Sequence, residues 1–246
     1  MKPLPRLSRI KTAVETLAGR LGPRLGLGLL AAAIVLGLFA ALAAEMKEGE
    51  TQRFDDSVRF AVHGVASPHA TSLLTHLTDL GSPMVLLPST LFGVLTFLRL
   101  RRIRGAVLLV VTMLGALLLE WLLKLVFHRV RPVPFFGLPI PSSYSFPSGH
   151  ALASFCFYAA LAELVAVRLR SVWLRVGVRA LATLVIVAVG FSRIYLGVHY
   201  ASDVLAGYGA AFVWVLTVAS ADRMFHRADE RGSKAAAAEP PPGGPG

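Results

Sequence analysis

The chain has 246 residues, of which 55% are hydrophobic and only 16% are charged, and its mean hydropathy is +0.64. Soluble domains carry charges on roughly a quarter of their residues, so this composition excludes an ordinary soluble globule and predicts an integral membrane domain. The formal charge of +11 alone would suit a nucleic-acid-binding protein. No basic segment is interleaved with aromatic residues, however, so nucleic acid is not an expected partner.

Six apolar segments are long enough, or nearly so, to cross a bilayer as helices, for which about 20 residues are needed. The second and fifth are the shortest, and Pro88 in the second is tolerable because neighbouring helices can satisfy the freed backbone groups. Small residues after the first segment suggest a signal peptide, but its apolar run exceeds the roughly 7–15 residues of such peptides, so we expect a retained helix. The six segments are residues 25–44, 82–98, 105–127, 150–167, 176–192 and 203–220.

The distribution of lysine and arginine predicts the orientation of these helices. The two termini and the two connections that fall on the same side as them hold 18 of the 25 basic residues, and the other three connections hold 7. Because cytoplasmic segments carry the excess of Lys and Arg, both termini are predicted to be cytoplasmic. We therefore expect a basic segment over 1–24, a six-helix domain over 25–220, and a cytoplasmic, disordered tail over 221–246.

The first predicted outer connection contains two amphipathic patterns. Apolar residues recur at helical spacing from Phe54 to Val65 and again from Leu73 to Leu80, on either side of Pro68. Two short helices lying on the outer surface fit this pattern. They would serve either as caps of the bundle or as guides for a lipid.

Three polar stretches interrupt the apolar pattern at the predicted outer face. The stretch "KLVFHRVRP" ends the third span, "PSGH" opens the fourth span, and "SRIYLGVHYASD" joins the fifth span to the sixth. Helix packing can bring these three stretches into one pocket, although they are far apart in the sequence.

The residue types in these stretches suit the binding of an oxyanion. Arginine offers planar donors that match phosphate oxygens, and lysine adds a point charge. A helix start presents free backbone N–H groups, and glycine there allows close approach of a ligand. The expected phosphate-binding residues are Lys124, Arg131, Ser148, Gly149 and Arg193.

Two histidines and one aspartate suggest catalysis at this phosphate site. His199 and Asp203 are four residues apart and therefore share a face of a helical turn. A carboxylate that holds one imidazole nitrogen leaves the other nitrogen free to act as a nucleophile. His150 lies on a separate element, where it can act as the general acid.

Other interpretations of the same residues remain open at this point. "PSGH" alone could be a helix cap, and Lys124 could form only an ion pair with Glu120, four residues earlier. A metal site built from His150, His199 and Asp203 is a further alternative, which the neighbouring cations disfavour.

The three stretches resemble the signature of the type 2 phosphatidic acid phosphatase (PAP2) superfamily, K-x6-RP, PSGH and SR-x5-H-x3-D, with no departure at any signature position. The resemblance implies a six-helix bundle with its active site on the outer, periplasmic side. It also implies that His199 forms a phosphohistidine, that Asp203 supports it and that His150 protonates the leaving group. No metal or other cofactor is implied.

The substrate class implied by the resemblance is a lipid phosphate or diphosphate held at the membrane surface. Phosphatidic acid, phosphatidylglycerol phosphate, undecaprenyl diphosphate and lipid A phosphates all fit, and a lipid A phosphatase or phosphotransferase is an alternative. The related vanadium haloperoxidases are soluble proteins, so the six apolar spans argue against that function. A lipid kinase would need a Gly-rich phosphate loop, which is absent from the sequence. A non-catalytic lipid-phosphate-binding protein is the alternative from another class.

Overall fold

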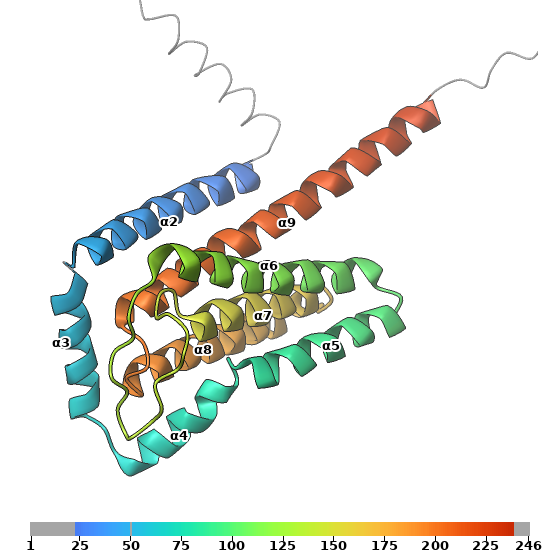
Figure 1. Ribbon diagram of the computed structural model, residues 1–246. Helices are drawn as coiled ribbons and strands as arrows, with labels where there is room; N and C mark the ends of the chain where they lie inside the picture. The colour runs from blue at the N-terminus through green and yellow to red at the C-terminus, as the bar shows by residue number, and fades with distance from the viewer. Residues whose placement is uncertain (1–22, 50, 239–246) are drawn as a thin grey trace, which may run out of the picture.

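A computed structural model describes residues 23–49 and 51–238, and helices are the only regular secondary structure in this part of the chain (Figure 1). The predicted segment over 1–24 therefore lies almost wholly outside the described residues. The helices are α2 (Pro23–Glu48), α3 (Thr51–Gly64), α4 (Pro68–Asp79), α5 (Pro83–Arg99), α6 (Ile103–Phe127), α7 (Gly149–Ala166), α8 (Val172–Tyr195) and α9 (Ala201–Ala238).

Each of the six predicted spans corresponds to one of the long helices, and the all-helical membrane fold is confirmed. α6, α7, α8 and the Ala201–Met224 part of α9 are each long and apolar enough to cross a bilayer. α5 has 17 residues, about 25 Å, which is shorter than the roughly 30 Å hydrocarbon core. Among the described residues, the helices that could cross a membrane number four, or up to six if α2 with α3 and α4 with α5 are each counted as one bent span.

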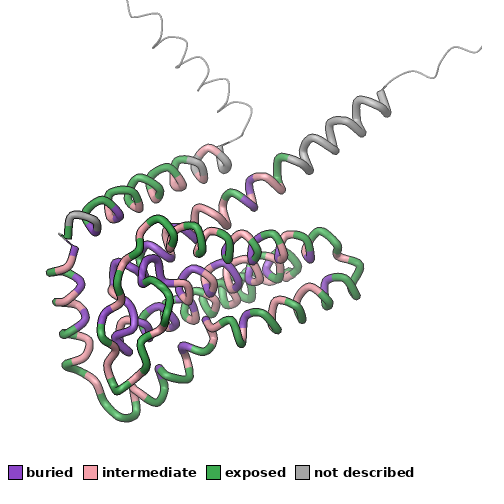
Figure 2. Tube along the Cα trace, in the orientation of Figure 1, coloured by how far each residue is buried: buried purple, intermediate pink, exposed green. Residues whose placement is uncertain are grey.

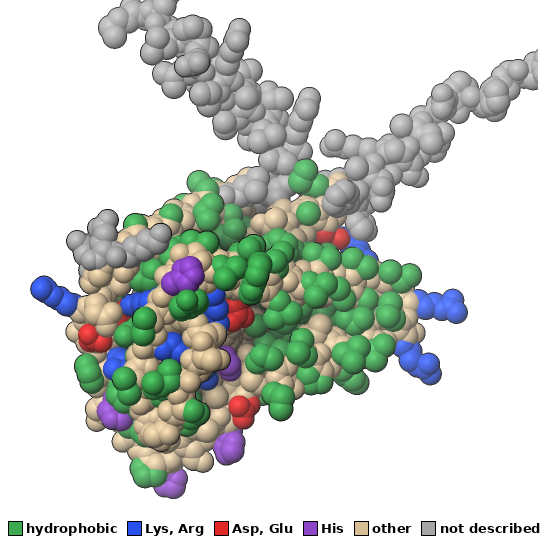
Figure 3. Space-filling view, in the orientation of Figure 1, with side chains coloured by type: hydrophobic (Ala, Val, Ile, Leu, Met, Phe, Trp, Pro, Cys, Tyr) green, Lys and Arg blue, Asp and Glu red, His purple; other side chains and the backbone are tan. Residues whose placement is uncertain are grey.

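The long helices form a bundle with α7 at its centre. α7 packs against α6, α8 and α9, and its buried Leu152, Cys156 and Phe157 belong to the main apolar core. Large apolar side chains cover the outside of the bundle between its two charged ends, as a bilayer requires (Figure 3). Phe92, Leu114 and Leu184 are examples of these exposed apolar residues.

A glycine sets the close contact between α7 and α9. A Cβ atom on Gly207 would lie only 2.8 Å from the backbone oxygen of Ser148, so a larger residue would push the two helices apart. The start of α7 therefore lies directly against the first turns of α9.

The two predicted amphipathic helices are present as α3 and α4, and they lie across the end of the bundle at which α7 and α9 begin (Figure 1). α4 is tied to α8 through the Tyr195 hydroxyl, which lies 2.8 Å from the Thr71 hydroxyl. The connection over 128–148 runs across the same end. Buried residues are concentrated there and along the bundle axis (Figure 2).

α3 packs against the bundle through its polar face and exposes its apolar face. Its buried residues are the polar Thr51, Asp55 and Arg59, whereas Phe54 and Phe60 are 52% and 60% exposed. The polar stripe faces the bundle because it finds hydrogen-bond partners there, one of which is the Val133 carbonyl for Arg59. The apolar face is left for the membrane interface.

α9 extends beyond the predicted end of the sixth span. The helix continues to Ala238, so residues 221–238, expected to be part of a disordered tail, are helical in the structure. Alanine and arginine are abundant in this stretch and have high helix propensity. The last residues of the expected tail, 239–246, lie outside the described residues.

Candidate active site

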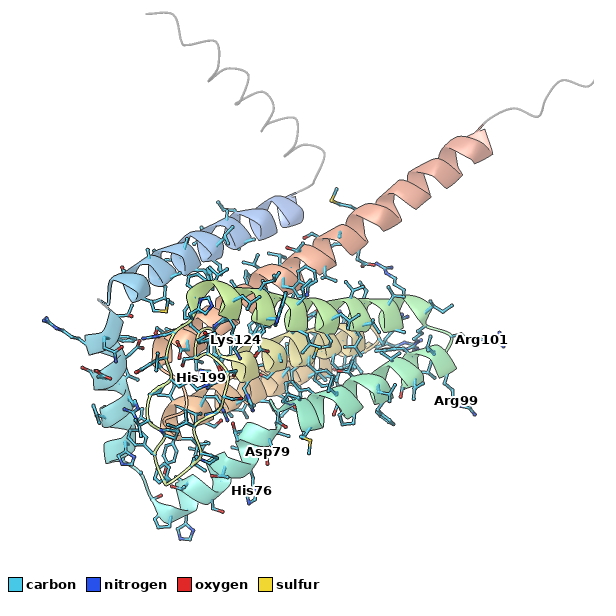
Figure 4. All side chains as sticks on the ribbon, viewed as in Figure 1. His76, Asp79, Arg99, Arg101, Lys124 and His199 are labelled. Carbon is cyan, nitrogen blue, oxygen red and sulfur yellow. The ribbon has the colours of Figure 1, made fainter. Side chains whose placement is uncertain are left out.

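The residues singled out in the sequence meet at the end of the bundle that α3 and α4 cover. Figure 4 shows Lys124, at the end of α6, and His199, between α8 and α9, at this same end. Asp203 and Ser148 lie behind the site and are fully buried. The other six expected site residues line one cavity of about 500 Å³, namely Lys124, Arg131, Gly149, His150, Arg193 and His199.

His199 and Asp203 form a buried pair. Their side chains are 1% and 0% exposed, and Nδ1 of His199 lies 3.4 Å from Oδ2 of Asp203. The same carboxylate oxygen accepts hydrogen bonds from the Tyr200 backbone N–H at 2.9 Å and from the Ser145 hydroxyl at 2.5 Å. Asp203 is therefore fixed in one orientation toward the imidazole.

The second ring nitrogen of His199 is directed at Arg131. Nε2 lies 2.8 Å from Nη1 of Arg131, and because a guanidinium can only donate, Nε2 must be the acceptor and the ring proton must be on Nδ1. Burial lowers the pKa of His199 to about 4, opposed by Asp203 and reinforced by Arg131 and Arg193. The imidazole is thus neutral near pH 7 and carries a lone pair on Nε2.

Arg131 is held by one backbone carbonyl group of its own connection, 128–148, and by one of the connection between α8 and α9. Its Nε donates to the Ser143 carbonyl at 2.7 Å, and its Nη1 donates to the Val198 carbonyl at 2.9 Å. Burial lowers the pKa of Arg131, against the opposing effects of Asp203 and Glu120. The group remains a cation, since an arginine keeps its proton under all ordinary conditions.

Two more cations line the cavity from α8 and α6. Nη1 of Arg193 donates to the Thr78 hydroxyl at 2.8 Å, and its Nε is buried without a partner among the described residues. Nζ of Lys124 lies 2.6 Å from a carboxylate oxygen of Glu120, so the expected ion pair exists within the site. The buried Nε–H of Arg193 is therefore available to donate to a ligand oxygen.

The start of α7 differs in one respect from the expected phosphate cradle. The Ser148 backbone N–H donates to the Asp203 carbonyl at 2.9 Å and so connects α7 to α9. The Ser148 hydroxyl is buried without a partner among the described residues. A Cβ atom on Gly149 would lie 2.1 Å from a carboxylate oxygen of Glu120, so only glycine allows this close approach.

The cavity has a polar end and an apolar end. His199 and the three cations surround the polar end, and the cavity continues between α5 and α6, where its walls are Leu87, Leu91, Leu114 and Leu117. All four leucines are also among the exposed large apolar residues, so this end of the cavity borders the lipid-facing surface. The shape suits a ligand with an anionic head and an apolar tail.

Arg129 and Asp55 form a part of the site that the sequence analysis missed. Arg129 donates to Oδ1 of Asp203 and to Oδ2 of Asp55, each at 2.7 Å, and Asp55 also accepts from the Ser202 backbone N–H at 2.9 Å. Burial lowers the pKa of Arg129, but the two carboxylates outweigh it and raise the pKa overall. The signal available in the sequence was the i, i+4, i+8 spacing of Thr51, Asp55 and Arg59, which defines a polar face on α3.

A metal-binding arrangement was the alternative use of His150, His199 and Asp203. In the part of the chain that the structure describes, no group of three or more His, Cys, Asp or Glu residues has the geometry to hold a metal ion. The groups that converge at the polar end of the cavity are three cations, the Glu120 carboxylate paired with one of them, and the imidazoles of His150 and His199.

Such a site, at one end of a helical membrane bundle, defines a class of protein. A buried imidazole oriented by a carboxylate, with several fixed cations beside it, serves phosphoryl transfer, in which most of the catalytic demand is charge stabilisation on phosphoryl oxygens. The fold and the site together define a membrane phosphatase.

Comparisons with known proteins identify the family. Residues 105–225 match the PAP2 superfamily model. Phosphatidylglycerophosphatase B of Bacillus subtilis is 31% identical over 201 residues, covering 77% of this chain and 93% of the relative. An undecaprenyl-diphosphatase of Sulfolobus acidocaldarius is 32% identical over 141 residues, covering 55% of this chain and 63% of that relative. The chain belongs to the PAP2 superfamily.

Two solved structures resemble this one. The crystal structure of a transmembrane PAP2-type phosphatidylglycerolphosphate phosphatase from Bacillus subtilis has a TM-score of 0.72 at 31% identity, covering 78% of this chain and 96% of that chain. The crystal structure of LpxE of Aquifex aeolicus has a TM-score of 0.52 at 23% identity, covering 67% of this chain and 94% of that chain. This likeness supports the fold alone.

Proposed function

We propose that this chain removes phosphate from a lipid phosphate or diphosphate through a covalent intermediate on His199. The observation that carries the proposal is the two-part cavity, which has His199 and three cations at one end and a leucine-lined wall between α5 and α6 at the other. The head of a membrane lipid would reach the histidine while its tail stays among apolar side chains and bilayer.

In the first step, Nε2 of His199 attacks the phosphorus atom. A P–N bond forms as the bond to the lipid oxygen breaks, and His150 gives that oxygen a proton. Asp203 accepts the Nδ1–H hydrogen bond and stabilises the positive charge that develops on the imidazole. In the second step His150 takes a proton from water, the water oxygen bonds to phosphorus, and the P–N bond breaks to release phosphate.

The remaining expected residues would bind the phosphoryl oxygens. Lys124, Arg131 and Arg193 provide cations from three different elements, and the unpartnered Nε of Arg193 is a free donor. Ser148 and Gly149 provide the start of α7, where the Ser148 hydroxyl and the helix dipole remain available although the Ser148 N–H is used. This set requires no metal ion for charge neutralisation.

The proposed orientation places the site at the outer face of the membrane and both termini in the cytoplasm. The support is the uneven distribution of basic residues, 18 on one side and 7 on the other. Arg99 and Arg101 lie at the end of the bundle opposite to His199 (Figure 4). A reporter fused within 133–146 should read external, and one fused at the C-terminus should read cytoplasmic.

The substrate proposed first is phosphatidylglycerol phosphate, because the relative with that activity in its name is covered over 93% of its length. Phosphatidic acid, undecaprenyl diphosphate and lipid A phosphates carry the same pairing of an anionic head with an apolar tail. Phosphotransfer would need a lipid hydroxyl in place of water at the second step.

The test is phosphate release by detergent-purified protein from all four lipids, with and without excess EDTA. We expect release from at least one lipid, unchanged by the chelator and inhibited by vanadate. Activity that EDTA removes and a divalent ion restores would return His150, His199 and Asp203 to a metal-binding role. Binding of lipid phosphates without release would support the non-catalytic alternative.

A further inference from the structure

A second cavity lies at the end of the bundle opposite to His199, between α6, α7 and α9. Its volume is about 860 Å³, and its inner walls are apolar, formed by Leu108, Leu164, Phe212 and Leu216. Because these helices run through the bilayer, the inner part of this cleft lies beside hydrocarbon.

The rim of this cleft is rich in arginine. Arg102, Arg104, Arg168 and Arg223 line it, together with the two acids Glu163 and Asp222. Arg104 makes a two-pronged contact with Asp222, with N–O distances of 2.7 and 2.5 Å, and Glu163 pairs with Arg179 outside the cleft. Both acids of the rim are therefore already engaged by guanidinium groups.

Three arginines of the rim form no ion pair among the described residues, and one of them, Arg223, donates to the Ala219 carbonyl of its own helix. The other two are Arg102 and Arg168, and within the part of the chain that the structure describes no carboxylate lies within ion-pair distance of either side chain. Arg102 is the residue that precedes α6, and Arg168 follows the end of α7. Both guanidinium groups thus start at helix ends, the level at which lipid headgroups lie, while the apolar wall extends one to three helical turns deeper.

We propose that this cleft binds one anionic phospholipid of the cytoplasmic leaflet, with its phosphate between Arg102 and Arg168 and an acyl chain along Leu108, Leu164, Phe212 and Leu216. Guanidinium forks match phosphate oxygens. Free phosphate could bind the arginines but would leave the apolar wall without a partner, so a lipid fits the cleft better. The N-terminal segment is a poor occupant, because residues 1–24 carry six lysines and arginines and would meet like charge. The proposal is independent of the chemistry assigned to His199.

The test compares two double variants that remove the same charge from the same end of the protein. Arg102→Gln/Arg168→Gln alters the cleft. Arg99→Gln/Arg101→Gln is the matched control, because those side chains extend from the loop end and do not line the cavity (Figure 4). Each protein, purified in neutral detergent, is titrated with phosphatidylglycerol, phosphatidylcholine or inorganic phosphate, and thermal unfolding is followed by tryptophan fluorescence.

For the unaltered chain and for the control, we expect Tm to rise saturably with phosphatidylglycerol only, because a ligand that binds the native state stabilises it. In the Arg102→Gln/Arg168→Gln variant, the midpoint of this response should move to a concentration about tenfold higher or more, because the charge-assisted hydrogen bonds to the phosphate are lost. Arg102 is half-buried and Arg168 is exposed, and Tm without lipid reports whether folding is preserved in the double variant.

Three results would overturn the proposal. Equal weakening in both double variants would mean general attraction of anions to this end. An equal response to inorganic phosphate would remove the lipid as occupant. A response that is kept in Arg102→Gln/Arg168→Gln but lost in Arg131→Gln would place the bound lipid in the cavity beside His199.

Discussion

The two ends of the bundle use the same ion-pair chemistry in different surroundings. At the end near His199, Arg129 bridges Asp55 and Asp203 with side-chain exposures of 10%, 0% and 0%. At the opposite end, Arg179 and Glu163 pair at 47% and 56% exposure. Exposed pairs contribute little to stability, whereas removing one partner of a buried pair leaves an uncompensated charge. The buried network therefore fixes the geometry of Asp203, whereas the exposed pair contributes little to the stability of its end.

The largest expected effect is at His199, the proposed nucleophile. His199→Ala should abolish both turnover and an acid-labile phosphoenzyme, whereas His76→Ala, an exposed histidine of α4, should leave both intact (Figure 4). Acid-quench labelling with radioactive phosphate measures the intermediate. A labelled intermediate that persists in His199→Ala would remove this residue as the nucleophile.

The next effect should be at His150, and its size should depend on the leaving group. A lipid alkoxide needs a proton to depart and a phenolate does not, so His150→Ala should lose about 10²–10⁴-fold in kcat/KM on a lipid phosphate and much less on para-nitrophenyl phosphate. kcat/KM is measured for both substrates, provided that the cavity admits the aryl phosphate. Equal losses on the two substrates would contradict a role as the leaving-group acid.

A direct comparison of the two ends is available from Asp55 and Glu163. Asp55→Ala leaves Arg129 buried without one of its two acids, and we expect a loss of about 3–5 kcal/mol in stability, together with a fall in kcat larger than the rise in KM. Asp55→Asn, which can still accept from Ser202, should recover part of both.

Glu163→Ala should change neither property measurably, because its pair with Arg179 is exposed. Thermal unfolding measures the stability of the three variants, and steady-state kinetics measure their kcat and KM. Equal shifts in Tm for Asp55→Ala and Glu163→Ala would show that burial does not distinguish the two ends.

The smallest expected effect is on pH dependence. The folded pKa of His199 lies below its ordinary 6.5, so its unprotonated form persists as pH falls and the acid limb of kcat/KM should lie near pH 4, after correction for substrate ionisation by 31P NMR. Arg131→Gln removes a cation that lowers this pKa and should move the limb upward by a fraction of a unit. Arg179→Gln should leave it in place. An acid limb at 6.5 in the unaltered chain would be inconsistent with a buried, neutral His199.

Most of the fold was predictable, because a bilayer imposes a minimum apolar length that can be read in the sequence. The predicted fifth span, 176–192, and the observed Val172–Tyr195 differ only at their ends. The orientation of α3 was not predictable from periodicity, which defines two faces but does not say which one meets the bundle. The continuation of α9 to Ala238 was missed because the prediction followed hydropathy, whereas that stretch is helical through propensity.

The site was predictable where residue chemistry alone specifies a role. Lys124, Arg131, Arg193, His150 and His199 converge on one cavity as expected. The bonds that depend on how segments approach one another could not be predicted. The Ser148 N–H is taken by the Asp203 carbonyl because Gly207 lets α9 approach α7, and no local pattern encodes that contact.

The hydrogen bond from Arg131 to Nε2 of His199 means that the lone pair of the proposed nucleophile is covered by a cation of the same protein. An incoming ligand must draw that guanidinium onto its own oxygens before the nitrogen can attack. A phosphate dianion does this readily, whereas an uncharged phosphotriester of the same shape offers the guanidinium little in exchange. A neutral ester that fits the cavity would then not react, because Arg131 would stay hydrogen-bonded to Nε2 of His199.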